Sequence, residues 1–241
     1  AVILEPATTE EPKDGFLHKL KELCKRHNTV FILDEMITGF RWHLQGASKY
    51  YDIEPDLVTY GKGMANGFSV AALGGKREIM ELGGIRHDGE RVFLISTTHG
   101  AEMSGLGAFV ETVKVYKELD VVGGMWSAGK RLMDGMNDIS KELGISDYFS
   151  FMGLPCSPNF ITKDASGAVS LEMRTLFVQE MIENNVLMPW VALCYMHGEA
   201  EIDAAIEAGR KSLKVYSRAL EHGAKKFLKG RPIKPVFRKR N

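Results

Sequence analysis

The sequence lacks the features that would place the chain in several specialised classes of protein. Its 31 lysine and arginine residues balance 31 aspartate and glutamate residues, so no basic excess indicates nucleic acid as a partner. No apolar run approaches the roughly 20 residues that a membrane-spanning helix needs. These absences favour a globular protein that acts on small molecules, with neither nucleic acid nor a membrane as a partner.

Cysteine is also scarce. The three residues Cys24, Cys156 and Cys194 are widely spaced and odd in number, which argues against a disulfide framework. This use of cysteine predicts a reducing, cytoplasmic setting. We expect Cys156 and Cys194 to be core residues. The seven histidines are scattered and show no metal-ligand spacing with the cysteines, so no metal site is predicted.

The 241 residues, of which 44% are hydrophobic, suffice for one large domain or two modest ones. The chain opens on the apolar run AVIL, which resembles a strand from the middle of a domain. We therefore expect it to be the C-terminal part of a longer protein, or one chain of a split protein.

The first part of the chain has the pattern of an α/β fold with a largely parallel sheet. Apolar β-forming segments are interrupted by a helical pattern over 15–28, for which Asp14 is a candidate N-cap. The strands predicted here are 1–4, 29–36, 57–61, 68–75 and 91–97.

Two helices, 98–119 and 125–143, follow, and from about residue 148 the pattern becomes α+β. Strands are predicted over 148–153, over 157–164 and near 186–189, with helices over 171–184 and 199–220. We place a domain boundary near residue 120. Residues 1–120 are predicted to belong to a large domain, and 121–241 to a smaller α+β domain.

Two of the predicted strands end in polar residues. Asp34 follows the apolar run VFIL, and Lys62 follows LVTYG. Ligands of open parallel α/β sheets bind beyond the carboxyl ends of the strands, so these two side chains share a crevice if their strands are neighbours. A structural ion pair, a general acid/base pair and a cofactor site all remain open from spacing alone.

Three motifs in fixed order narrow this choice. The segments LDEMITGFR (33–41), PDLVTYGK (55–62) and GGKREIM (74–80) resemble the class III aminotransferases, which depend on pyridoxal 5'-phosphate (PLP). The resemblance is closest to the glutamate-1-semialdehyde 2,1-aminomutase branch. It implies the fold type I architecture, with a mainly parallel central sheet flanked by helices, and the transfer or internal shift of an amino group.

The resemblance also implies roles for individual residues. Lys62 would form a Schiff base with PLP and afterwards move a proton between the substrate and the cofactor. Asp34 would lie under the pyridine nitrogen and keep the ring protonated. Met36 would pack on the ring face, whereas Glu35 would be structural. Glu5, at the end of the first strand, could reach the same crevice.

Thr97 matches a family threonine that reaches the PLP phosphate of the neighbouring subunit, which implies a homodimer with shared sites. The Asn-Pro that usually follows in the family is Ala101-Glu102 here, so Thr98 could serve instead. The phosphate loop and the stacking aromatic of the family's N-terminal half are not in this chain, and no arginine is assigned to a substrate carboxylate. An aminomutase, an ω-amino-acid aminotransferase and an amino-sugar aminotransferase remain open. So do a non-catalytic or split subunit and a lysine-dependent aldolase.

Overall fold

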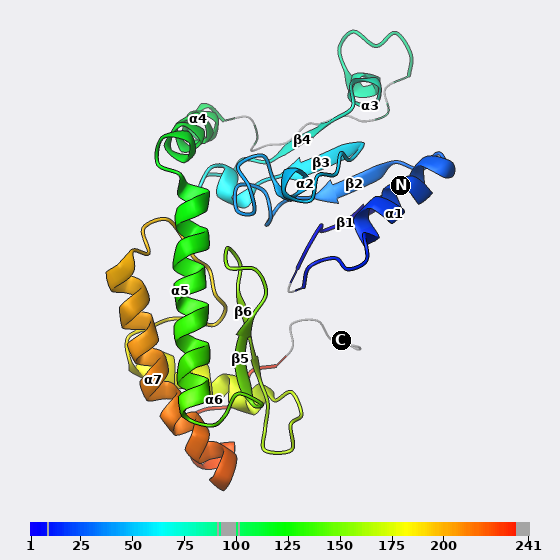
Figure 1. Ribbon diagram of the computed structural model, residues 1–241. Helices are drawn as coiled ribbons and strands as arrows, with labels where there is room; N and C mark the ends of the chain where they lie inside the picture. Colours follow the sequence, from blue (N-terminus) through cyan, green and yellow to red (C-terminus); the bar gives the residue numbers. More distant parts are fainter. Residues whose placement is uncertain (9, 91, 93–99, 101, 235–241) are drawn as a thin grey trace. The chain divides into compact units, whose positions relative to one another are not determined.

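The computed structural model describes residues 1–8, 10–90, 92, 100 and 102–234. The chain divides into two compact units, Ala1–Gly123 and Gly124–Asn241 (Figure 1). The first unit contains a single four-stranded sheet among its described residues, and the second contains long helices and a β-hairpin.

The sheet of the first unit has the strand order β1 (Val2–Leu4), β2 (Phe31–Asp34), β3 (Leu57–Tyr60) and β4 (Ala72–Gly75). The first three strands are parallel, and only β4 runs antiparallel to its neighbour. The prediction of a largely parallel sheet is therefore confirmed. The fourth strand begins at Ala72 rather than at residue 68, and the strand predicted over 91–97 lies almost wholly outside the described residues.

The helices of the first unit are α1 (Phe16–Arg26), α2 (Ala47–Tyr50), α3 (Arg77–Met80) and α4 (Met103–Glu118). The 3₁₀ turns are η1 (Lys62–Met64) and η2 (Glu81–Gly83). Leu17 and Cys24, one above the other on α1, are buried against Phe31 and Leu33 of β2. The predicted cap at Asp14 is wrong. The N-cap is Gly15 in a left-handed conformation, and no side chain caps the helix.

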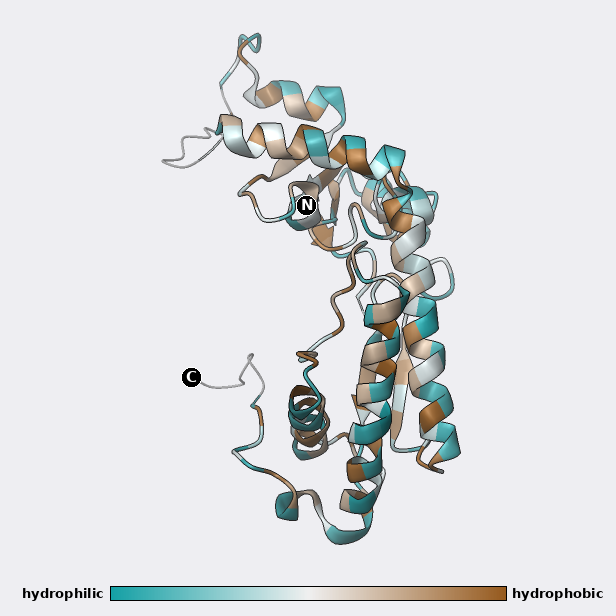
Figure 2. Ribbon diagram, turned by 90° about the vertical axis from the view of Figure 1, so that its left-hand side faces the viewer, coloured by the Kyte–Doolittle hydropathy of each residue, from teal (hydrophilic) through white to brown (hydrophobic). Residues whose placement is uncertain are grey.

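The second unit contains most of α5 (Val121–Glu142), together with α6 (Leu171–Glu183), α7 (Glu199–His222) and η3 (Ala224–Lys226). Its hairpin consists of β5 (Phe149–Met152) and β6 (Asn159–Thr162). Hydrophobic and hydrophilic residues are interspersed along its long helices, as expected for amphipathic helices (Figure 2). The core centres on Phe149, Phe177 and Tyr216, whose rings contact one another through Phe149.

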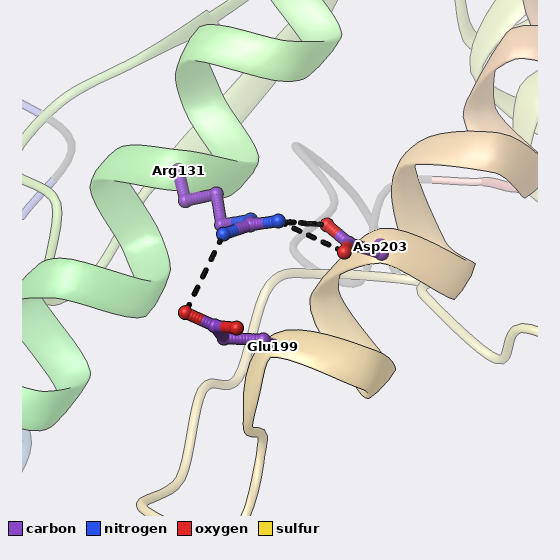
Figure 3. Close-up of polar contacts among 3 residues, drawn as sticks. All are labelled: Arg131, Glu199 and Asp203. Carbon is purple, nitrogen blue, oxygen red and sulfur yellow. Dashed lines mark hydrogen bonds and ion pairs between the residues drawn. The ribbon is translucent and has the colours of Figure 1, made fainter.

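An ion cluster ties α5 to α7 within the second unit (Figure 3). The Arg131 guanidinium donates to both carboxylate oxygens of Asp203, at 2.6 and 2.8 Å. Its other terminal nitrogen lies 3.7 Å from Glu199 Oε1. The bidentate geometry fixes the relative register of the two helices.

Two further sequence predictions for this unit are wrong. Residues 186–189 form no strand, because the segment has no ladder partner among the described residues. Cys194 is exposed rather than buried, whereas Cys156 is in the core as predicted. None of the three cysteines, all of which are among the described residues, forms a disulfide.

Candidate active site

The carboxyl ends of β1, β2 and β3 lie at the same edge of the sheet because these strands are parallel. Asp34 is the last residue of β2 and stands opposite Thr59 of β3 in the ladder. Lys62 follows β3 directly after Gly61. Glu5, which is exposed, follows β1 at the same edge. The fold therefore brings the chain positions of Glu5, Asp34 and Lys62 to one edge.

Two hydrogen bonds hold the half-buried Asp34 carboxylate at the end of its strand. Its Oδ1 accepts the hydroxyl of Thr59 at 3.1 Å and the backbone N–H of Met36 at 3.0 Å. The second bond turns the chain, so β2 ends two residues earlier than the sequence predicts. Met36 consequently lies in a turn, and strand alternation does not determine the direction of its side chain.

Lys62 occupies an unusual backbone conformation. Its φ of 47° is left-handed, a region that non-glycine residues rarely adopt, and its side chain is exposed. Met36 approaches the backbone directly before it. A Cβ atom at Gly61 would collide with the flexible end of the Met36 side chain, so a larger residue there would displace that side chain. Strained residues of this kind cluster at functional sites.

Glu35 supports the site from within the core, in agreement with its predicted structural role. It is fully buried, and its Oε2 accepts the hydroxyl of Thr38 at 3.0 Å and the backbone N–H of Ala47. Its Oε1 accepts the backbone N–H of Ser48 at 2.7 Å. The carboxylate thus ties the turn after β2 to the start of α2.

The residue that sequence reasoning missed is Phe40. It has a left-handed φ of 61°, and its ring contacts the rings of Tyr60 and Tyr116. The only signal in the sequence was its place in the TGFR motif. Burial, and then the charge of Glu35, raise the pKa of Tyr60. Thr97, in contrast, lies outside the described residues.

Several arginines are engaged in structural contacts within the second unit. Arg131 is bound by carboxylates of α7, as described above. Arg174 lies 4.1 Å from the centre of the Phe160 ring and donates to two backbone carbonyl oxygens. Arg210 pairs with Glu142. Each would have to leave a partner before it could bind the carboxylate of a substrate.

Two negative findings bear on the chemistry. Searched over its described residues, the chain has no cluster of three or more histidine, cysteine, aspartate or glutamate side chains suited to a metal ion. Across the same residues, no helix combines the length and the apolar character that crossing a membrane requires.

Comparisons with known proteins agree with the motifs. The family model described as aminotransferase class-III matches residues 1–186. A 3-aminobutyryl-CoA aminotransferase from Cloacimonas acidaminovorans is 31% identical over 86% of this chain and 49% of its own length. A glutamate-1-semialdehyde 2,1-aminomutase from Desulfitobacterium hafniense is 32% identical over 89% of this chain and 52% of its own length. The chain thus spans about half the length of the curated relatives it matches.

Solved structures show the same fold. A transaminase solved with PLP bound superposes with a TM-score of 0.82 at 20% identity, over 92% of this chain and 53% of the other. An ω-transaminase from Sphaerobacter thermophilus gives 0.79 at 20% identity, over 90% and 52%. Together with the mainly parallel sheet, these neighbours establish the PLP-dependent transferase fold. The chain belongs to the class III aminotransferase family.

Proposed function

We propose that this chain serves a PLP-dependent enzyme that transfers an amino group from an amine or amino acid to a carbonyl acceptor, or shifts it within one molecule. The observation that carries the proposal is the placement of Asp34 and Lys62 at the adjacent carboxyl ends of two parallel strands. The relatives and neighbours named above act in amino-group transfer, which favours this function over a non-catalytic subunit or a cofactor-free aldolase.

The residues at this edge fit PLP chemically. The Asp34 carboxylate, steadied by the Thr59 hydroxyl, is a suitable acceptor for a protonated pyridine nitrogen. The amine of Lys62 is a suitable nucleophile for an aldehyde when deprotonated. Met36, beside Gly61, is in reach of a ligand held between these two groups. When bound, PLP supplies the electron sink that stabilises negative charge on the substrate carbon.

Each of the chain's own residues at this edge would have a separate role. Asp34 would hold a proton on the pyridine nitrogen of the cofactor. Lys62 would hold the cofactor, and its amine would carry a proton to and from the substrate carbon. Gly61 and Gly63 keep the backbone on both sides of Lys62 free of side chains. Glu5, exposed at the end of β1, is available to contact the same ligand.

The wider assignments are part of this proposal. The enzyme acts in the cytoplasm as a homodimer, and Thr97 of one subunit reaches the phosphate group held by the other. Residues 1–120 belong to the cofactor-binding domain, and 121–241 form the small domain. An aminotransferase and an aminomutase are among the relatives at nearly equal identity, so the substrate class is an amino compound with a carbonyl partner.

The proposal is tested by trapping PLP on the chain with borohydride and mapping the modified peptide. Wild-type chain should carry the reduced adduct on Lys62, and Lys62→Ala should lose it. The matched control is Lys49→Ala, which removes another exposed lysine of the first unit and should leave the adduct in place. An adduct that survives in Lys62→Ala, or that maps to other lysines in the wild type, would refute the assignment.

A further inference from the structure

Two residues at the edge of the sheet share an unusual backbone state. Phe40, with φ 61°, lies in the loop after β2, and Lys62, with φ 47°, lies in the turn after β3. A left-handed φ is rare for non-glycine residues and most unfavourable for bulky ones, so the surrounding structure must stabilise both. Phe40 lies in the loop that begins after Asp34, the last residue of β2, and Lys62 lies in the turn that begins after Tyr60, the last residue of β3. The two strained residues therefore follow neighbouring parallel strands.

The contacts of Phe40 bracket Lys62 from both sides. Its ring meets the Tyr60 ring edge-on, with the centroids 6.0 Å apart. Its Cβ lies 3.9 Å from the position that a Cβ atom would take at Gly63. Phe40 therefore touches the residue two before Lys62 and lies beside the residue after it. A short turn that is held at both flanks has little freedom to open.

Tyr116 of α4 closes the same turn from a third element. Its ring contacts Phe40 edge-on at 5.8 Å, and its hydroxyl oxygen also lies 3.9 Å from the Cβ position of Gly63. Phe40 of the loop after β2 and Tyr116 of α4 thus both lie beside Gly63, the residue that follows Lys62. Aromatic rings suit this task because they bury a large area with few rotatable bonds.

We propose that Phe40 and Tyr116 are positioning residues, which hold the turn at Lys62 so that its amine is presented at the strand edge beside Asp34. Neither side chain needs to touch the cofactor. The expected effect on the reactivity of Lys62 rests on the proposed function. The structural part of the inference, that the two rings hold the turn, can be measured without any ligand.

The first measurement is hydrogen exchange of the turn. The Met64 N–H donates to the Gly61 carbonyl oxygen at 3.0 Å and reports opening of this turn. In Phe40→Leu, exchange over 61–65 should be about fivefold faster, the effect expected from losing aromatic contacts. The Glu35 N–H, which donates to Thr59 O at 3.0 Å in the sheet, should change less than about twofold. A merely structural role would accelerate both.

The matched control is Phe109→Leu. Phe109 also lies on α4 and its ring contacts Phe40 at 6.3 Å, but no atom of Phe109 is among those nearest to the Cβ position of Gly63. This variant should leave the exchange of the turn within about twofold of the wild type. Phe40→Tyr keeps the ring and should restore the wild-type rate. If Phe40→Leu does not fold, Tyr116→Leu opens the same turn from α4 and carries the test.

The second measurement is the rate at which PLP and borohydride label Lys62, as a function of pH. Phe40→Leu and Tyr116→Leu should label at least about fivefold more slowly than Phe109→Leu, because a mobile turn misplaces the amine. Equal exchange and equal labelling in all three variants would overturn the inference while leaving the proposed function intact. If the wild type is not labelled at Lys62 at all, the proposed function fails, and the exchange data alone decide whether the two rings hold the turn.

Discussion

The clearest test of how the site is supported is the substitution Glu35→Gln. The Glu35 carboxylate is fully buried and accepts three hydrogen bonds, from the Thr38 hydroxyl and from the backbone N–H groups of Ala47 and Ser48. The two N–H groups approach different oxygens of the carboxylate. A glutamine has nearly the same shape, but whichever way its amide is turned, its NH₂ group faces one of these donors.

The expected loss of stability follows from this mismatch. A buried donor left without an acceptor costs about 1–3 kcal/mol, and the remaining bonds lose the strengthening that an ionised acceptor gives. Removing the buried charge recovers part of this cost. We therefore expect Glu35→Gln to lower the free energy of unfolding of the first unit by about 2 kcal/mol.

The assay is hydrogen exchange in a urea series, read at peptides of β2 and β3, so that the first unit is followed separately from the second. Glu22→Gln, an exposed change of the same chemistry on α1, is the control and should stay within about 0.5 kcal/mol of the wild type. If Glu35→Gln matches this control, the carboxylate does not tie the turn after β2 to the start of α2 as described.

Three further predictions concern stability. Lys62→Gly should be more stable than Lys62→Ala by about 0.5–1 kcal/mol in urea denaturation, because φ is 47° there and only glycine adopts it without strain. An equal stability of the two variants would refute that strain. Tyr216→Phe should cost about 1–3 kcal/mol in the second unit, because the Tyr216 hydroxyl lies 2.8 Å from Lys163 O and 3.0 Å from Tyr148 O in the core. A cost below about 0.5 kcal/mol, measured by urea denaturation, would contradict it. Burial pushes the pKa of Asp56 up, but the hydrogen bonds from Lys76 and Phe31 N–H and the charge of Lys76 outweigh it and lower that pKa. Asp56 therefore stabilises the fold above its unfolded pKa of about 3.9, and this stabilisation is lost as the pH falls through the lower folded value. Asp56→Asn should flatten the stability curve below about pH 4, and an unchanged slope would count against the pairing of Asp56 with Lys76.

The sequence predicted the parallel arrangement well because periodicity and strand composition are local signals. The helices over 171–184 and 199–220 were found for the same reason, since each has apolar residues at helical spacing. The errors occurred where a tertiary partner decides the outcome. The segment 186–189 has the composition of a strand, but no strand pairs with it in the part of the chain that the structure describes. Cys194 is exposed although its neighbour Leu193 is buried.

Part of the candidate site could be selected from the sequence. Asp34 and Lys62 could be selected because a polar residue at the end of an apolar strand has no packing explanation. The proposed roles of Phe40 and Tyr116 could not be predicted from this sequence. Tyr116 belongs to a helix far along the chain from Phe40, and no residue type near Phe40 indicates its left-handed φ. The end of β2 was also misplaced, because the Asx turn at Asp34 competes with strand propensity.

The ladder between β2 and β3 has a consequence for inactivating substitutions. The ladder pairs Asp34 with Thr59 and so fixes the position of Asp34 along β3, the strand that Lys62 follows. A shift of one residue in that pairing would turn Asp34 to the opposite side of the sheet. In a genetic screen for loss of activity, changes at Ile32 or Val58 that shift this pairing should therefore be recovered together with changes at Asp34 and Lys62.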